Sequence, residues 1–276
     1  MQTFGRNGLT FDVRDTGPVD GLPVVLLHGF PQDASAFDDV ARRRAARGMR
    51  TLAPDQRGYP PGARPTGRRA YAAAELVADV TALLDAAGVA RAHVVGHDWG
   101  AGAAWAFAAR HPERTISLTA LSVPHPRAVS RAAWQSSQAV RSTYIAFFQV
   151  PRLPESALLA DDGARLRASL ARTGLDETRA AHYTRRMLAP GALTGALGWY
   201  RGIPGGGWGD LPPVTVPTIL VHGLTDPFVA PASIRGARAW VHAPFVAIPV
   251  EGGHWLPERH PGTVAAAVVA QAGHAG

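Results

Sequence analysis

Short runs of apolar residues recur along the chain and have the length and composition of buried β-strands. They occupy residues 23–28, 50–54, 92–96, 116–122, 217–222 and 245–250. Continuous apolar runs of this length are typical of parallel strands that are covered on both faces of a sheet. The runs at 23–28, 92–96 and 217–222 each end in a small or polar residue, a position from which side chains can reach a site at the edge of the sheet.

Helical patterns lie between these strands, at residues 34–47, 70–87, 101–110 and 264–271. Alternation of strand and helix predicts an α/β fold with a mostly parallel, doubly wound sheet. The opening segment, residues 3–16, instead alternates apolar and polar residues around Asn7-Gly8. Because Asn-Gly is a strong hairpin signal, we expect the first two strands to be antiparallel.

The alternation breaks between residues 125 and 210, where helical, aromatic-rich and arginine-rich pieces replace the strand pattern. This stretch ends in Gly205-Gly-Gly-Trp-Gly209 and Leu211-Pro-Pro213, which is typical of a linker. We therefore predict a core domain from residues 1–124 and 211–276, with a helical cap, residues 125–210, inserted into it. The alternative is a set of peripheral helices without a function.

Composition narrows the function classes. The 276 residues are 46% hydrophobic and include no cysteine, which excludes disulfides, thiolate metal sites and a cysteine nucleophile. The net charge is +7, but all 28 cationic side chains are arginines spread along the chain, so we expect no nucleic-acid partner. The sequence has no apolar run of membrane-spanning length and no stretch of signal-peptide type, which favours a cytoplasmic protein without a membrane partner.

The segment Val94-Val-Gly-His-Asp-Trp-Gly100 carries the first chemical signal. A strand ends there and a helix begins, and small residues flank an acid at the spacing of a nucleophile elbow. The tight turn lifts Asp98 clear of the sheet, at a helix N-terminus that favours negative charge. Taken alone, Asp98 could equally be the N-cap of the helix.

Two downstream residues favour the nucleophile. Asp226 follows the strand at 217–222, and His254 follows the strand at 245–250. The order of nucleophile, acid and histidine is that of the α/β-hydrolase triad, and each member follows a strand, where open α/β sheets place their sites. The remaining candidate acid, Asp55, precedes the elbow and is predicted to be structural.

The loop His28-Gly-Phe-Pro31, directly after the first apolar run, is the third element of the predicted site. In an α/β-hydrolase this loop supplies one amide of the oxyanion hole, here that of Phe30, and the residue after the nucleophile supplies the second, here Trp99. We place four further residues in the substrate pocket: His28, Pro31, Trp199 and Trp255. For His28, stabilisation of the loop is the simpler explanation.

The sequence resembles an epoxide hydrolase of the α/β-hydrolase superfamily from about Leu9 to Val269. The motifs that carry the resemblance are His28-Gly-Phe-Pro31, Asp55-Gln-Arg-Gly-Tyr59, Gly96-His-Asp-Trp-Gly100, Gly223 to Asp226 and Gly253-His-Trp255. The resemblance implies two cap tyrosines that bind the epoxide oxygen. Tyr144 and Tyr200 match them, whereas Tyr183 is interpreted as a packing residue. Gly198 stands where the family usually has asparagine, which questions the local positioning of Tyr200.

The resemblance implies hydrolysis of a small-molecule epoxide to a vicinal diol through an ester on Asp98, without cofactor or metal. Water activated by His254, with Asp226 as its partner, would hydrolyse that ester. A homodimer is a possible assembly. Two alternatives stay open: a haloalkane or haloacid dehalogenase that uses the same aspartate, with Trp99 as a halide donor, and a binding protein that keeps the fold without catalysis. Halide release and diol formation would distinguish them.

Overall fold

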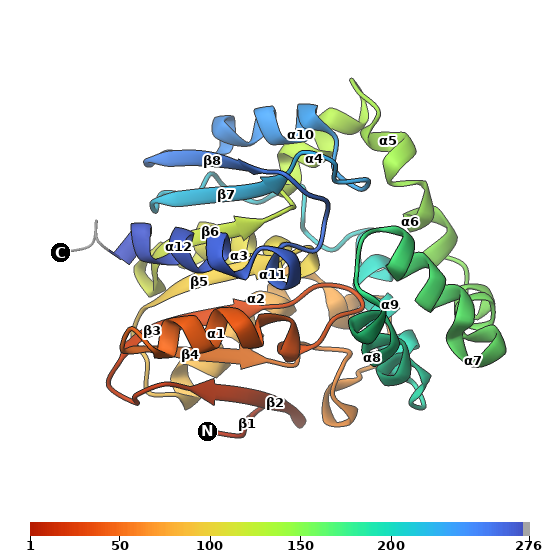
Figure 1. The fold of residues 1–276 in the computed structure, drawn as a ribbon, viewed down its shortest axis with the longest axis horizontal. Helices are drawn as coiled ribbons and strands as arrows, with labels where there is room; N and C mark the ends of the chain where they lie inside the picture. The colour runs from red at the N-terminus through yellow and green to blue at the C-terminus, as the bar shows by residue number, and fades with distance from the viewer. Residues whose placement is uncertain (273–276) are drawn as a thin grey trace.

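The computed structural model describes residues 1–272 and is built around a sheet of eight strands in the order β1-β2-β4-β3-β5-β6-β7-β8 (Figure 1). The strands are β1 (Thr3–Arg6), β2 (Leu9–Thr16), β3 (Leu22–Leu27), β4 (Met49–Pro54), β5 (Ala92–His97), β6 (Thr115–Leu121), β7 (Thr218–Gly223) and β8 (Phe245–Val250). From β4 to β8 all neighbours are parallel, while β1 pairs antiparallel with β2 and β2 with β4.

The α-helices of residues 1–272 follow the strands in the chain. They are α1 (Asp38–Ala45), α2 (Ala73–Ala86), α3 (Trp99–Arg110), α4 (Pro126–Ala133), α5 (Gln138–Arg141), α6 (Thr143–Phe148), α7 (Leu153–Arg172), α8 (Glu177–Leu188), α9 (Ala192–Arg201), α10 (Pro231–Gly236), α11 (Leu256–Arg259) and α12 (Pro261–Ala272). Short 3-10 helices are η1 (Ala34–Phe37), η2 (Pro61–Ala63), η3 (Arg68–Tyr71), η4 (Pro112–Arg114) and η5 (Ala237–Trp240).

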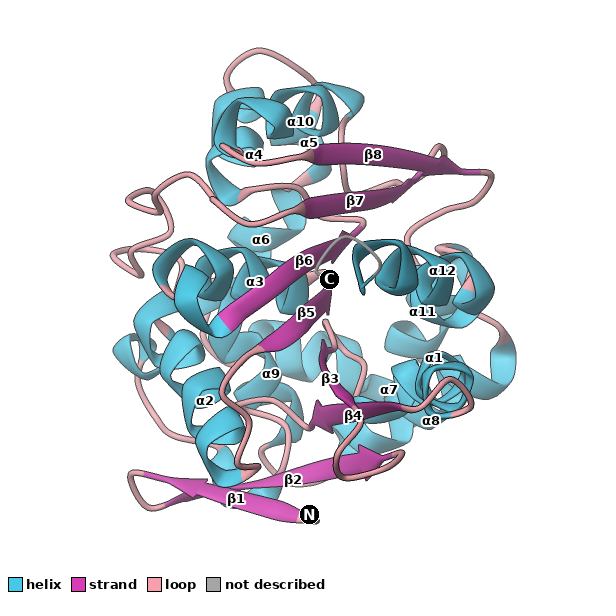
Figure 2. Cartoon of the chain, turned by 90° about the vertical axis from the view of Figure 1, so that its left-hand side faces the viewer, coloured by secondary structure: helices cyan, strands magenta, loops and turns pink. Residues whose placement is uncertain are grey.

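Both faces of the sheet are covered, as the apolar runs predict. Figure 2 shows α1, α11 and α12 on one side of the sheet and α2 and α3 on the other. The side chains of β5 are buried along its whole length, and the adjacent strands β3 and β6 are buried over most of theirs. Such two-sided burial explains why these strands appear in the sequence as continuous apolar runs rather than alternating ones.

The predicted hairpin at the N-terminus is confirmed. Asn7 and Gly8 both have positive φ, 50° and 76°, which is the backbone of the two-residue turn that Asn-Gly favours. Two predicted helices are interrupted near their N-terminal ends. The one expected at 34–47 forms η1 and then α1, and the one expected at 70–87 forms η3 and then α2.

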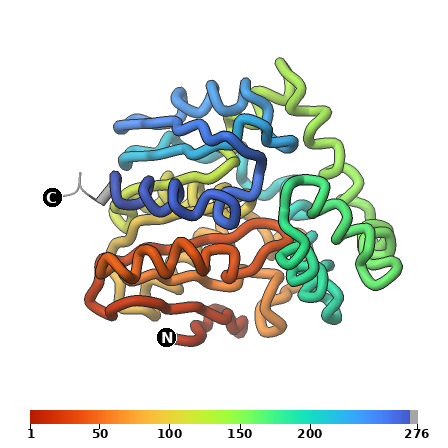
Figure 3. The backbone as a smooth tube through the Cα atoms, viewed as in Figure 1, coloured from red at the N-terminus to blue at the C-terminus, as the bar shows by residue number. Residues whose placement is uncertain are grey.

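Residues 122–217, between β6 and β7, form a helical insertion that contains α4 to α9. Most of it lies at one end of the sheet, where the green segment of Figure 3 leaves and rejoins the core. Its first helix, α4, instead packs against α10 beside the sheet. The helix α7 changes direction at residues 160–163, whose backbone is not helical. Division of the chain into a core domain and a cap at 125–210 stays a prediction.

Within residues 1–272, no helix combines the length and the apolar character that crossing a membrane requires. The cytoplasmic location and the homodimer stay predictions.

Candidate active site

Asp98 stands on a sharp turn between β5 and α3. Its φ of 53° and ψ of −119° lie in a region that residues other than glycine rarely occupy, so the turn holds the residue in a strained conformation. A Cβ atom at Gly96 would collide with the Gly100 carbonyl, and one at Gly100 with the Leu27 carbonyl. The small residues around Asp98 are therefore required by the close approach of backbone, as the elbow pattern predicts.

The structure brings Asp98, Asp226 and His254 together. His254 Nδ1 lies 2.8 Å from Asp226 Oδ2, and His254 Nε2 lies 3.5 Å from Asp98 Oδ2. All three side chains are largely buried, with at most 14% of each side chain exposed. The imidazole thus has one carboxylate on each ring nitrogen, with Asp226 oriented to fix its tautomer.

These contacts shift the pKa values of the two residues that would react. Burial by itself lowers the pKa of His254, but the carboxylates of Asp226 and Asp98 more than offset it and raise that pKa to about 10. Burial opposes ionisation of Asp98, yet its contacts with His254 and with a backbone amide outweigh burial and lower its pKa. The pair at rest is therefore a carboxylate facing an imidazolium.

The loop after β3 contacts the other oxygen of Asp98. The Phe30 amide donates a hydrogen bond of 2.8 Å to Asp98 Oδ1. Gly29 lies directly against the Asp98 side chain, where a Cβ atom would overlap it. Oδ1 is therefore held by the loop, which leaves Oδ2 free to face the cavity and His254. The second predicted oxyanion donor, the Trp99 amide, begins α3 next to Asp98 in the chain, and its role stays a prediction.

Tyr144 on α6 and Tyr200 on α9 line the same cavity as Asp98. Their rings lie 5.8 Å apart, edge to face. Burial raises the pKa of both phenols well above the usual value, and the charge of Asp98 adds to the shift. Both hydroxyls therefore keep their protons at neutral pH and are available as hydrogen-bond donors.

Gly198 has a structural explanation. The ring of Tyr71 occupies the space beside it, and a Cβ atom at this position would lie 2.5 Å from Tyr71 Cζ. A larger residue is excluded because the Tyr71 ring already packs against this part of α9. Tyr200, two residues later, is held in the cavity wall by contacts with Phe30 and Trp99.

The cavity has two lobes that meet at Asp98 and the two tyrosines. Asp98, Tyr144, Tyr200 and Phe228 line both lobes. One lobe, about 150 Å³, also contains His254 and is otherwise lined by Phe30, Pro31, Phe148, Leu158, Leu166, Ser169, Leu170, Thr173 and Trp255. The other lobe, about 170 Å³, is otherwise lined by Trp99, Gly102, Val123, Pro126, Val129, Ser130, Gln138, Ser142, Ile145, Ile203, Trp208 and Val229.

Two of the four predicted pocket residues, Pro31 and Trp255, line the cavity, and two do not. His28 lies beneath its loop, where its Nε2 accepts a 3.0 Å hydrogen bond from the Gln56 amide. Trp199 is turned into the core, where its indole donates to the Arg57 carbonyl at 2.6 Å. Placing these two in the pocket was wrong, because backbone groups of the neighbouring loop bind their ring nitrogens. His28 stabilises the loop.

The contacts of Asp55 and Tyr183 explain why both side chains lie outside the cavity. Asp55 is structural, since its carboxylate accepts from the Ala34 amide at 2.8 Å and from Arg186 at 2.5 Å. Tyr183 is buried as predicted, but it also donates a 3.0 Å hydrogen bond to Glu258.

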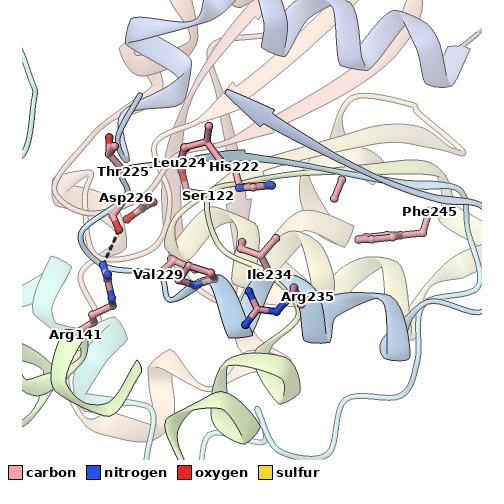
Figure 4. A pocket seen from close by; sticks show the side chains of 13 residues that line it. Ser122, Arg141, His222, Leu224, Thr225, Asp226, Val229, Ile234, Arg235 and Phe245 are labelled. Atoms are coloured by element: carbon pink, nitrogen blue, oxygen red, sulfur yellow. Dashed lines mark hydrogen bonds between the residues drawn. The ribbon is translucent and has the colours of Figure 1, made fainter. Parts of the chain in front are cut away.

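A separate cavity of about 500 Å³ lies on the far side of the Asp226 loop and includes Ser122, His222 and Arg235 in its wall. Figure 4 shows Arg141, from α5, pointing to this loop, where it donates a 2.8 Å hydrogen bond to the Asp226 carbonyl. Neither Asp98 nor His254 lines this cavity. Sequence reasoning missed Arg141, because no local pattern links one arginine of the insertion to a loop 85 residues away.

In residues 1–272, no cluster of three or more histidine, aspartate or glutamate side chains has the arrangement of a metal site.

The fold and the site define an α/β-hydrolase with an aspartate on the elbow. Residues 23–261 match the family described as the alpha/beta hydrolase fold, and the chain belongs to this family.

Among its relatives is Epoxide hydrolase A of Mycobacterium tuberculosis, 32% identical over 95% of this chain and 94% of that protein. AB hydrolase superfamily protein YfhM of Bacillus subtilis is also 32% identical, over 95% and 94% of the two chains. The crystal structure of Epoxide Hydrolase A from Mycobacterium thermoresistibile has a TM-score of 0.84 and 26% identity, covering 98% of this chain and 96% of that one.

Proposed function

We propose that this protein is an epoxide hydrolase that forms a covalent ester on Asp98 and releases a vicinal diol. The observation that carries the proposal is the placement of two buried tyrosines, whose pKa values are raised by burial, in the cavity wall that Asp98 also lines. A carboxylate can attack an epoxide carbon only if the departing ring oxygen is stabilised as it gains charge. Two of the similar proteins, from Mycobacterium tuberculosis and Mycobacterium thermoresistibile, are epoxide hydrolases, which supports the proposal.

In the first step, Oδ2 of Asp98 attacks a carbon of the epoxide, because Oδ1 is engaged by the Phe30 amide. The carbon–oxygen bond of the ring breaks, and the ring oxygen takes a proton from Tyr144 or Tyr200. The result is an alkyl ester in which Oδ1 is the carbonyl oxygen, already hydrogen-bonded in the oxyanion hole. The helix N-terminus behind Asp98 favours the ionised carboxylate that this step needs.

In the second step, His254 loses its resting proton to solvent, because the ester has removed the charge of Asp98. Water then attacks the carbonyl carbon of the ester while the neutral His254 accepts a proton from it. Asp226 stabilises the imidazolium that forms, and the Phe30 amide stabilises the charge on Oδ1. The tetrahedral intermediate collapses with release of the diol, which takes a proton from His254. Asp98 is restored with an oxygen from water and loses its carboxyl proton to solvent, while His254 and the tyrosine each regain a proton from solvent.

The two lobes suggest the class of epoxide. They have similar volumes, about 150 and 170 Å³, and both are lined mainly by apolar side chains. They meet at Asp98 and the two tyrosines, so an epoxide bound there has space for a substituent on each ring carbon. We therefore propose that internal epoxides with apolar groups on both carbons are better substrates than terminal epoxides of the same size.

Oxygen tracing tests the covalent route. With enzyme in excess in heavy-oxygen water, the first diol should carry ordinary oxygen from Asp98, and the label should appear in the peptide that contains Asp98. Direct attack of water would label the diol in the first turnover and would overturn the proposal. The dehalogenase alternative is tested in parallel by halide release from haloalkanes and haloacids of matched size, which we expect to be absent.

A further inference from the structure

A chain of buried hydrogen bonds runs beneath His254 and ends at a carboxylate that the mechanism does not use. His97 Nε2 lies 2.8 Å from the His254 carbonyl oxygen, and His97 Nδ1 lies 2.8 Å from Gln32 Oε1. Gln32 Nε2 donates to Glu258 Oε1 at 2.7 Å. His97, Gln32 and Glu258 are each at most 5% exposed.

The orientation of the Gln32 amide is determined by two neighbours. The Gly29 amide donates to Gln32 Oε1 at 2.8 Å, so the oxygen must be on that side. Glu258 is an acceptor on the other side, so the amino group must face it. The reversed amide would place donor against donor at Gly29 and acceptor against acceptor at Glu258.

This orientation has a consequence for His97. Its Nδ1 faces the amide oxygen of Gln32, and its Nε2 faces the main-chain carbonyl of His254. Both partners accept hydrogen bonds and neither can donate one. A neutral imidazole has a single N–H and would leave one nitrogen lone pair against an oxygen at 2.8 Å. Only the doubly protonated ring satisfies both contacts.

We propose that Glu258 is a positioning residue for hydrolysis, which acts through Gln32 to keep His97 doubly protonated and thereby holds His254 and the oxyanion loop in place. His97 and Ser122 Oγ both contact the His254 carbonyl, at 2.8 and 2.7 Å. The same Gln32 oxygen binds the Gly29 amide, one residue before the oxyanion donor. The effect on ester hydrolysis rests on the proposed function, whereas the protonation of His97 does not.

Glu258 acts on His97 through its negative charge more than through its hydrogen bonds. Glu258 Oε1 accepts from both Gln32 and Tyr183, two bonds that a glutamine oxygen could also accept, while Oε2 has no partner in the described chain. Burial, together with the charge of His254, lowers the pKa of His97 to about 3, and burial raises that of Glu258. Both shifts oppose the charged forms, and the charged ring is favoured instead by its two acceptor contacts. A buried imidazolium therefore needs a nearby anion, and a carboxylate one amide away supplies it.

Other charged groups surround the two ends of this chain. His254 adds to the lowering of the His97 pKa, whereas Asp98 and Asp226 favour the charged ring. At the other end, Arg179 of α8 donates to the Glu258 carbonyl at 3.3 Å and favours the ionised carboxylate. The cationic ring at His97 is thus flanked by carboxylates on both sides.

The decisive experiment is nitrogen-15 NMR of the histidine side chains at pH 7, with His97 assigned by its loss in His97→Gln. We expect both ring nitrogens of His97 to carry protons in the wild-type protein. Glu258→Gln should convert His97 to a neutral tautomer, and the exchange variant Q32E/E258Q, which keeps one carboxylate and one amide in the pair, should restore the charged ring. A neutral His97 in the wild-type protein overturns the inference.

Single-turnover kinetics supply the functional readout. Glu258→Gln should slow hydrolysis of the ester about tenfold, less than the ~10²-fold loss that a 1 Å misplacement can cause, with alkylation changed less than twofold. The exchange variant should recover most of this loss, and Glu75→Gln, a control on α2, should change neither step. Wild-type hydrolysis in a folded Glu258→Gln overturns the inference. If Glu258→Gln does not fold, the nitrogen-15 spectrum of the wild-type protein tests the inference by itself. Absence of any ester in the wild-type protein would contradict only the proposed function.

Discussion

Removal of one phenol hydroxyl from the cavity tests donation of a proton to the epoxide oxygen. This step distinguishes epoxide opening from dehalogenation by the same aspartate. Tyr200→Phe and Tyr144→Phe each delete one hydroxyl and leave the ring in place. Tyr200 is 3% exposed, and its ring contacts Phe30, Trp99 and Phe148 at centroid distances of 4.9 to 5.3 Å. Water therefore has little access with which to replace the lost donor.

The expected loss follows from the charge on the ring oxygen. One donor to a developing oxyanion in a buried site contributes about 3 kcal/mol. Since about 1.36 kcal/mol corresponds to a tenfold change in rate, each variant should form the ester ~10²-fold more slowly. The rings of Tyr144 and Tyr200 are 5.8 Å apart, and in the proposed mechanism both hydroxyls bind the same oxygen, so the two losses should not add fully.

The assay is single-turnover alkylation, followed by rapid quenching and mass spectrometry of the Asp98 peptide. Tyr71→Phe is the matched control, because Tyr71 is also a buried tyrosine but its hydroxyl donates to the Pro65 carbonyl outside the cavity. We expect the control to alkylate at the wild-type rate. If Tyr144→Phe and Tyr200→Phe also match the wild-type protein on every epoxide tested, the phenols are packing residues and the argument from oxyanion stabilisation is refuted.

Three further predictions concern the base, its partner and the packing of α9. His254→Gln should accumulate the ester, seen as a mass increase of one epoxide on the nucleophile's peptide, while diol turnover falls about 10²–10⁴-fold; normal turnover would contradict the assignment. The pKa of His254 is raised to about 10, so its contribution to stability is present below about pH 6.5 and is lost as pH rises toward 10. Asp226→Asn should therefore make the free energy of unfolding, measured in urea, depend less on pH between about 6.5 and 10. Gly198→Ala should lower the free energy of unfolding by about 1–3 kcal/mol, because the new methyl group overlaps the Tyr71 ring. Gly209→Ala, with no atom near the added methyl group, should change it little.

The fold and the triad could be predicted because both follow from local sequence. A buried parallel strand needs a continuous apolar run, and the elbow after β5 needs small residues around Asp98, so both leave a pattern in adjacent positions. Asp226 and His254 follow the same rule, since each comes after the end of a strand and such ends meet at one edge of the sheet.

Side-chain direction could not be predicted in the same way. Trp199 and Tyr200 are adjacent on α9, yet one indole binds the Arg57 carbonyl in the core and the other ring faces the cavity. Which of them lines the site depends on how α9 sits on the core, and the sequence of the helix does not contain that information. The link from Glu258 to Gln32 spans 226 residues and has no local signature at either end.

In the proposed mechanism, the charge of Asp98 determines when His254 can act as a base. In the free enzyme His254 lies between two carboxylates, 2.8 Å from Asp226 and 3.5 Å from Asp98, and its pKa is raised to about 10. A protonated His254 cannot accept a proton from water, but it lowers the pKa of Asp98 and keeps the nucleophile ionised. Formation of the proposed ester would neutralise Asp98 and remove one of the two charges that hold the proton. The pKa of His254 would then fall, and the imidazole would become available as the base. Hydrolysis of the preformed ester, measured in single turnovers across pH, should therefore titrate well below pH 10, and a midpoint at or above that value would show that Asp98 does not control the base.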